Sequence, residues 1–104
     1  MTAVSMRMVL EAWRVTIARP EMARVRKLDA ATTRYDRVVL VGCMRELCSP
    51  TPSFSEVAVH MRTSHGACIE LLERWQDMRW QERYGWLKLI DEEARHERTN
   101  RASE

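Results

Sequence analysis

The chain of 104 residues is 45% hydrophobic and 31% charged, and its formal net charge is +2. This length allows one domain with a modest core, and the hydrophobic content excludes a wholly disordered chain. No run approaches the roughly eighteen apolar residues that a membrane span needs. Three cysteines, an odd number, fit a reducing compartment better than a set of disulfides. We therefore expect a cytoplasmic protein that makes no membrane contact.

Residues 1–30 are predicted to form an N-terminal helical extension. Its apolar residues recur every three or four positions, the spacing of one helix face: Met6, Leu10, Trp13 and Ile17. This helix should end near Pro20, and a second short apolar stripe follows at residues 22–28. Arg7 and Glu11 interrupt the first stripe, so it lacks the apolar core of a signal peptide.

Residues 31–90 are predicted to form the main domain, beginning with a long helix. Thr33 and Asp36 are typical of a helix start, and the apolar run that follows should continue as the central helix to Leu47. A strand over residues 38–41 is the alternative, because β-branched residues favour sheet. The charged residues on both sides favour the helix. Two prolines then predict a loop over residues 48–52.

Two short helices joined by a tight turn are predicted between residues 53 and 78. Ser53 and Glu56 form the pattern of a capping box for the first helix, and Thr63 or Ser64 can cap the second. The second helix has an apolar stripe at three-and-four spacing: Cys68, Leu71, Leu72, Trp75 and Met78. Such a pair is typical of a helix-turn-helix, which presents its second helix to the DNA major groove. The same pattern is also expected for two helices that form a simple corner in a small helical domain.

The last part of the chain allows two structures. Residues 80–90 can form a hairpin turning at Gly85, as in the wing of a winged helix, or a helix that buries one face. That face would contain Trp80, Tyr84, Leu87 and Ile90. The tryptophans of this region can serve the core or a partner surface. Residues 91–104 are rich in charge and are expected to form a disordered tail.

The sequence gives little indication of metal binding or catalysis. Its closest approach to a zinc-finger pattern combines two cysteines with two histidines: Cys43, Cys48, His60 and His65. The cysteines fall at the end of a strong helix pattern, and the expected turn separates the histidines. No nucleophile–base set and no phosphate-binding glycine loop with a lysine is apparent. We expect neither a metal, nor a cofactor, nor enzyme activity.

The segment from Arg34 to about Met78 resembles the C-terminal duplex-binding domain of the bacterial replication initiator DnaA. Residues 44–48, Met-Arg-Glu-Leu-Cys, are similar to the end of a helix in that family, and residues 54–58 to its next short helix. Residues 62–65, Arg-Thr-Ser-His, are similar to the signature that opens its recognition helix. Ser64, Gly66 and Ala67 replace residues that the family uses to read bases, so its target sequence does not carry over. No ATPase module is present.

The same segment is also similar to winged-helix repressors of the LexA or MarR kind, with residues 80–90 as the wing. Both resemblances imply a non-enzymatic, double-stranded-DNA-binding protein with a regulatory or replication-initiator-like role. The groove contacts would be Arg62, Thr63, Ser64, His65, Gly66 and Ala67, and the phosphate contacts Arg34, Arg37 and Arg45.

One observation opposes this hypothesis. Residues 63–90, which include the expected recognition helix, carry as many acidic as basic residues, and Glu70 and Glu73 would repel phosphate. The alternative is a protein-interaction module that uses the Trp-rich C-terminal third, for another protein or for self-association. The predicted fold is all-α in either case.

Overall fold

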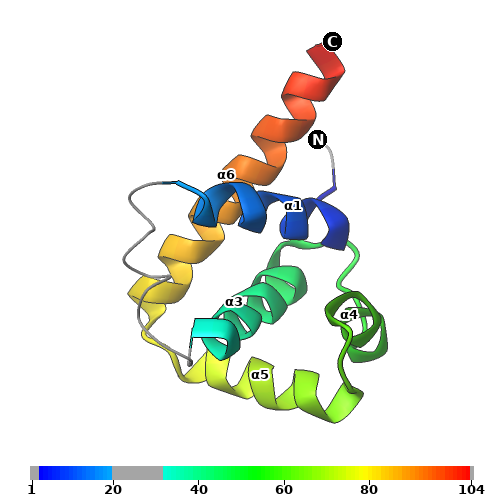
Figure 1. The fold of residues 1–104 in the computed structure, drawn as a ribbon, viewed down its shortest axis with the longest axis vertical. Helices are drawn as coiled ribbons and strands as arrows, with labels where there is room; N and C mark the ends of the chain where they lie inside the picture. The colour runs from blue at the N-terminus through cyan, green and yellow to red at the C-terminus, as the bar shows by residue number, and fades with distance from the viewer. Residues whose placement is uncertain (1–2, 20–31, 104) are drawn as a thin grey trace.

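The computed structural model describes residues 3–19 and 32–103. All regular elements in these ranges are helices (Figure 1): α1 (Met6–Ile17), α3 (Thr32–Leu47), α4 (Phe54–Met61), α5 (His65–Asp77) and α6 (Trp80–Ser103). The all-α prediction is confirmed. The apolar stripe at residues 22–28 lies outside the described residues. No described helix has an apolar stretch long enough to cross a bilayer.

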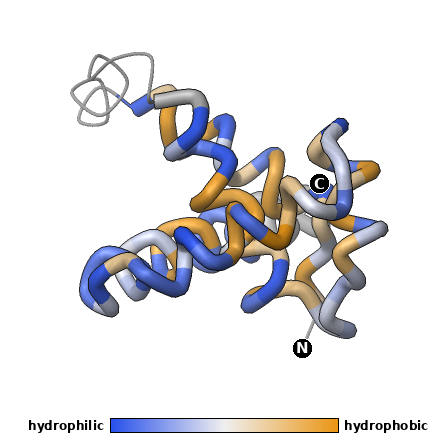
Figure 2. Tube along the Cα trace, turned by 90° about the horizontal axis from the view of Figure 1, so that it is seen from below, coloured by the Kyte–Doolittle hydropathy of each residue, from blue (hydrophilic) through white to orange (hydrophobic). Residues whose placement is uncertain are grey.

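Helix α3 lies at the centre and contacts the other four described helices. Its middle is buried on nearly every side: Val38, Val39, Leu40, Val41, Cys43 and Met44. A helix that is apolar all round is stable only when neighbours cover each face. The alternative of a strand over residues 38–41 is therefore wrong, because packing against several helices outweighs the β-propensity of the valines. Figure 2 shows hydrophobic residues concentrated where the helices meet.

The boundaries of α4 and α5 follow from their caps, as predicted. The Ser53 hydroxyl accepts a hydrogen bond from the backbone N–H of Glu56 at 3.1 Å, and the Ser64 hydroxyl accepts one from Ala67 at 3.1 Å. The Glu56 carboxylate accepts from the Ser53 hydroxyl at 3.2 Å, whereas the capping box predicted a bond to the Ser53 backbone. Arg62 ends α4 in the left-handed conformation, with φ 53° and ψ 50°.

Helix α6 occupies the region where the sequence allowed a wing, and it continues through residues 91–103, where a disordered tail was predicted. The predicted buried face is wrong at Trp80 and Tyr84, which are 65% and 61% exposed, but right at Ile90, and Leu87 is half-buried against the core. Among residues 80–96 of α6, the buried positions are Trp86, Ile90 and Ala94. Ala94 extends the packed face beyond the predicted end at Ile90, so the helix does not stop where the charged residues begin.

Helices α1 and α6 pack side by side and join the two ends of the chain to the core. The indole rings of Trp13 and Trp86 lie 5.1 Å apart between centroids. The Trp86 indole N–H donates to the Tyr35 hydroxyl at 2.8 Å, and that hydroxyl donates to Glu82. Burial, followed by the hydrogen bond to Glu82, raises the pKa of Tyr35 to about 12. Tyr35 therefore stays protonated at neutral pH and links α3 to α6.

The contact between α3 and α5 depends on Gly42, which lies against the ring of Trp75. A Cβ atom at Gly42 would come closer than 3.0 Å to three atoms of the indole. Trp75 is 1% exposed, and its indole N–H donates to the Glu46 carboxylate. The missing side chain of glycine is therefore what allows the two helices to approach.

The three cysteines are all buried and free. Burial raises the pKa of the Cys48 thiol to about 11 and also raises the pKa values of Cys43 and Cys68. Thiols of this kind remain protonated and unreactive at neutral pH. They serve as small hydrophobic residues.

Candidate nucleic-acid interface

The six predicted groove residues, 62–67, are consecutive in the chain and form the turn between α4 and α5 together with the start of α5. Arg62, Ser64, His65 and Gly66 are exposed, and Thr63 and Ala67 are half-buried. A Cβ atom added at Gly66 would meet no atom within 4 Å. The first turn of a helix also has backbone N–H groups that the helix itself cannot pair. This turn therefore offers hydrogen-bond donors on an unobstructed surface.

Phe54, at the start of α4, holds two of the predicted contact residues in place. The Arg45 guanidinium lies over its ring, 4.4 Å from the centroid, and the His65 ring meets it edge-on at 5.6 Å. Arg45 also donates a hydrogen bond to the backbone oxygen of Pro52. Arg45 and His65 come from α3 and α5 and are brought together around one aromatic ring. This role of Phe54 was not predicted from the sequence.

Arg34 and Arg37 lie elsewhere. Both are exposed near the start of α3, where Tyr35 contacts Glu82 and Trp86 of α6. Arg34 and Arg45 are eleven positions apart in the helix, which corresponds to about 16 Å along its axis. The structure therefore separates the predicted phosphate contacts into two groups. Only Arg45 is close to the first turn of α5.

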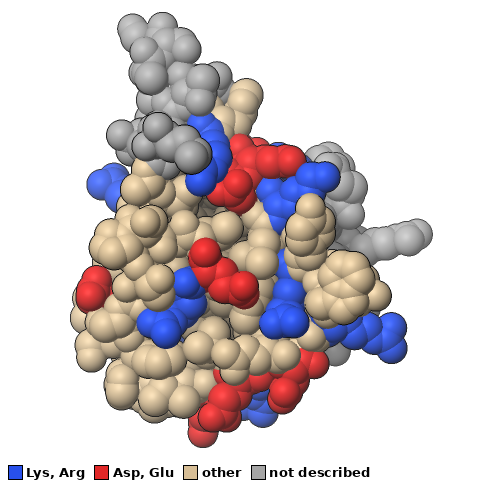
Figure 3. Space-filling view, turned by 180° about the vertical axis from the view of Figure 1, so that it is seen from behind, with Lys and Arg blue, Asp and Glu red and all other residues tan. Residues whose placement is uncertain are grey.

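The outward face of α5 is acidic beyond its first turn. Glu70, Glu73 and Asp77 are exposed there, with Arg74 as the basic residue among them. Figure 3 shows acidic side chains gathered along its lower edge, where α5 runs in Figure 1. Carboxylates on this face would repel the phosphates of a duplex laid along the whole helix. Within α5, acidic side chains are therefore absent only from the N-terminal turn, residues 65–69.

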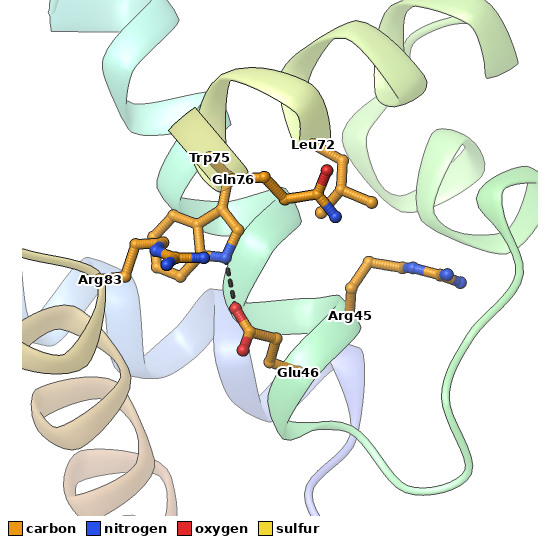
Figure 4. A pocket seen from close by; sticks show the side chains of 6 residues that line it. All are labelled: Arg45, Glu46, Leu72, Trp75, Gln76 and Arg83. Atoms are coloured by element: carbon orange, nitrogen blue, oxygen red, sulfur yellow. Dashed lines mark hydrogen bonds between the residues drawn. The ribbon is translucent and has the colours of Figure 1, made fainter. Parts of the chain in front are cut away.

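A pocket of about 270 Å³ lies between α3, α5 and α6 (Figure 4). It is lined by Arg45, Glu46, Leu72, Trp75, Gln76 and Arg83. Figure 4 shows the Arg45 side chain extending away from Trp75, while Glu46 is hydrogen-bonded to the Trp75 indole. The Nε atom of Arg83 is buried and has no hydrogen-bond partner within the described part of the chain. Neither this pocket nor the place of Arg83 in it was predictable from residue spacing.

The two cysteines and two histidines of the zinc-like pattern differ in environment. Cys43 and Cys48 are buried, whereas His60 and His65 are exposed. Across residues 3–19 and 32–103, no group of three or more histidine, cysteine or acidic side chains is arranged to hold a metal ion.

In comparisons with known proteins, the chain matches no family model, no curated protein and no solved structure.

Proposed function

We propose that this protein binds double-stranded DNA by placing the first turn of α5 in the major groove. The observation that carries this proposal is the open segment formed by Arg62, His65 and Gly66, which lies at the N-terminus of a helix capped by Ser64. Helix-turn-helix proteins use the corresponding turn to contact base edges. Its backbone donors and positive helix end also favour a negatively charged partner.

The arginines around the turn would contact the sugar-phosphate backbone of the DNA. Arg45 is fixed by Phe54 and Pro52, and Arg62 is exposed at the turn, so both can contact phosphates beside the groove. Arg34 and Arg37 are too far along α3 for the same contact and contribute longer-range attraction. The role we assign to this binding is regulatory or replication-initiator-like.

The acidic residues of α5 restrict how the duplex lies. Glu70, Glu73 and Asp77 favour an end-on approach, in which the second half of α5 points away from the phosphates. Affinity should come mostly from a few phosphate contacts, so it should fall linearly with salt on a logarithmic scale.

Gly66→Glu provides a direct test of this approach. The new side chain meets no atom of the protein, and an acidic residue in the first turn stabilises a helix by about 0.3–1 kcal/mol. We expect affinity for random-sequence duplex DNA to fall at least about tenfold, with no loss of thermal stability, because a carboxylate would enter the groove. Fluorescence anisotropy across a salt series measures this.

Gly85→Glu is the matched control, because a Cβ at Gly85 on α6 also meets nothing within 4 Å. The affinity of the Gly85→Glu variant for the duplex should stay within about twofold of that of the unsubstituted protein. Equal effects of the two substitutions would mean that only net charge matters, and no effect of Gly66→Glu would exclude the proposed approach.

Arg62→Gly separates binding from stability. A left-handed residue other than glycine costs about 1–2 kcal/mol, so glycine at this helix end should raise the free energy of unfolding by up to about 1 kcal/mol. The same change removes a cation from the proposed interface and should weaken duplex binding severalfold. Urea unfolding and anisotropy measure the two effects. A more stable variant with undiminished binding would remove Arg62 from the interface.

A protein-interaction module is the second candidate function. Trp75 and Trp86 are buried, so only Trp80 and Tyr84 of the Trp-rich third remain for a partner. The observation that favours this candidate is the exposure of these two large aromatic side chains, since aromatic residues are enriched at interfaces. Competition by polyglutamate tests for an acidic protein partner.

A further inference from the structure

The N-terminal half of α6 carries a repeated pattern of cations and large apolar side chains on one edge. Arg79, which immediately precedes α6, is followed by Trp80, Arg83 by Tyr84 and Leu87 by Lys88, so a cation and an apolar residue are adjacent at every fourth position, in reversed order in the last pair. Figure 3 shows basic side chains beside bulky uncharged ones on the side of the molecule where α6 lies. This edge, residues 79–88, is called the α6 edge below.

Trp80 and Tyr84 do not contribute to the core. Their exposed fractions are 65% and 61%, whereas Trp75 and Trp86 are at most 6% exposed. The two residues lie four positions apart, so both project from the same side of α6. Two flat aromatic surfaces are therefore presented to solvent about 6 Å apart along the helix axis.

Three acidic residues in or beside the α6 edge are engaged in contacts, whereas Asp77 and Glu92 are exposed. Glu82 accepts a hydrogen bond from Tyr35, Glu46 accepts one from Trp75, and Asp91 is paired with Arg95. Arg79 and Lys88 are exposed, and Arg83 lies between them. The α6 edge therefore presents cations close to its aromatic rings and suits a negatively charged ligand.

The pocket beside Arg83 indicates where one negative group would lie. The buried Nε–H of Arg83 has no acceptor within the described residues, and a buried donor without an acceptor is unfavourable. The pocket that Arg83 lines is open to a group from outside. The Arg83 guanidinium can contact a phosphate at this pocket, because arginine is well suited to phosphate recognition; its Nε atom is enclosed by protein and is reached only if the side chain moves.

From these observations we propose that the α6 edge binds single-stranded nucleic acid. Bases stack on Trp80 and Tyr84, while Arg79, Arg83 and Lys88 contact the phosphates. Stacked bases in a duplex strand are 3.4 Å apart, so a spacing near 6 Å suits a strand whose bases are unstacked from one another. A duplex also hides the faces of its bases, which these rings would need to reach. Such combinations of aromatic and basic residues are typical of single-strand binding.

This site is distinct from the one proposed for duplex DNA. Helix α5 spans 13 residues, about 20 Å, between its N-terminal turn and the start of α6. The single-strand proposal does not depend on duplex binding, and each can fail without the other.

The test is a titration of the full chain with labelled twelve-nucleotide strands at low salt. Oligo(dT) and oligo(rU) distinguish DNA from RNA, and an abasic strand of equal charge separates stacking from charge alone. We expect binding to oligo(dT), to oligo(rU) or to both, quenching of tryptophan fluorescence, and at least about tenfold weaker binding of the abasic strand. Affinity should fall with increasing salt.

Three variants assign the binding to the α6 edge. Trp80→Ala should weaken binding of the base-containing strand about tenfold or more and remove most of the quenching, whereas Trp80→Phe should retain part of the affinity because it keeps a ring. Val59→Ala is the matched control, since Val59 on α4 is 76% exposed and lies outside the α6 edge. Thermal unfolding should be nearly unchanged in all three.

Several outcomes would overturn the proposal. Equal affinity for the abasic strand would show that charge alone holds the strand. Binding that survives Trp80→Ala would place it elsewhere, and a loss caused by Gly66→Glu would place it at α5. Polyglutamate that competes as well as oligo(dT) would indicate an acidic protein partner, and no binding at low salt by the folded protein would exclude the site.

Discussion

Gly42→Ala should destabilise this protein by more than about 3 kcal/mol. The added methyl group would overlap the Trp75 ring, which is buried and hydrogen-bonded to Glu46. Overpacking in a core typically costs 1–3 kcal/mol, and more when the neighbours cannot shift. The backbones of α3 and α5 would then have to separate. Because whole domains are stable by only about 5–15 kcal/mol, this loss is a large fraction of the total stability, and the urea midpoint should fall markedly.

Gly85→Ala is the control, and its effect on the free energy of unfolding should have the opposite sign. Gly85 lies within α6 and has open space around its Cα, so alanine should stabilise the helix by about 0.5–1 kcal/mol. Urea unfolding followed by circular dichroism measures both variants. A second variant, Gly42→Ala with Trp75→Phe, tests the cause, because a smaller ring should restore part of the loss. Similar stability of the two alanine variants would contradict the proposed close approach.

Trp86→Ala should cost about 3–5 kcal/mol, the range observed when a large buried side chain is removed from a core. Trp86 is 6% exposed, packs against Trp13 and donates its N–H to Tyr35. Its loss leaves a cavity between three helices. In a domain of this size we expect the melting temperature to fall by more than about 10 °C.

Trp80→Ala is the matched control for Trp86, because it makes the same chemical change six residues earlier on the same helix. Trp80 is 65% exposed, so its removal should cost less than about 1 kcal/mol. Thermal unfolding of the two variants compares the buried and exposed sides of α6 directly. An equally large loss at Trp80 would show that the predicted stripe, with Trp80 in the core, was right after all.

The features that local chemistry determines were predictable from the sequence. The caps at Ser53 and Ser64 set the starts of α4 and α5, because a side-chain oxygen and a nearby backbone N–H are enough to define them. Helix α1 was predictable from its apolar spacing, and α3 from its long apolar run. These signals do not need the rest of the molecule.

The face that α6 buries was not predictable in this way. Its first three turns carry apolar residues in several directions, including Trp80, Tyr84, Trp86 and Ile90. Periodicity alone cannot choose among them. Contacts with α1 and α3 decide the orientation, since Trp13 and Tyr35 both meet Trp86. Ala94 continues the same buried face into a stretch whose charge suggested disorder.

The candidate site also combines features that the sequence predicts with features that depend on how the helices pack. The exposed turn at residues 62–67 follows from the two caps, and its position was predicted. The placement of Arg45 beside His65 depends on Phe54, which connects three helices and has no signature in residue spacing. The separation of Arg34 from Arg45 along α3 likewise became apparent only once the direction of each helix was known.

The packing of α1 against α6 has a consequence for synthesis on the ribosome. Arg19 and Glu93 form an ion pair at 2.6 Å although 74 positions separate them in the chain. Contacts of such long range slow folding, because a large loop must close before they form. Chains emerge N-terminus first at about 5–20 residues per second, so α1 waits several seconds for its partner helix. During translation α3, α4 and α5 can already pack together, while the part of α1 that α6 covers stays exposed.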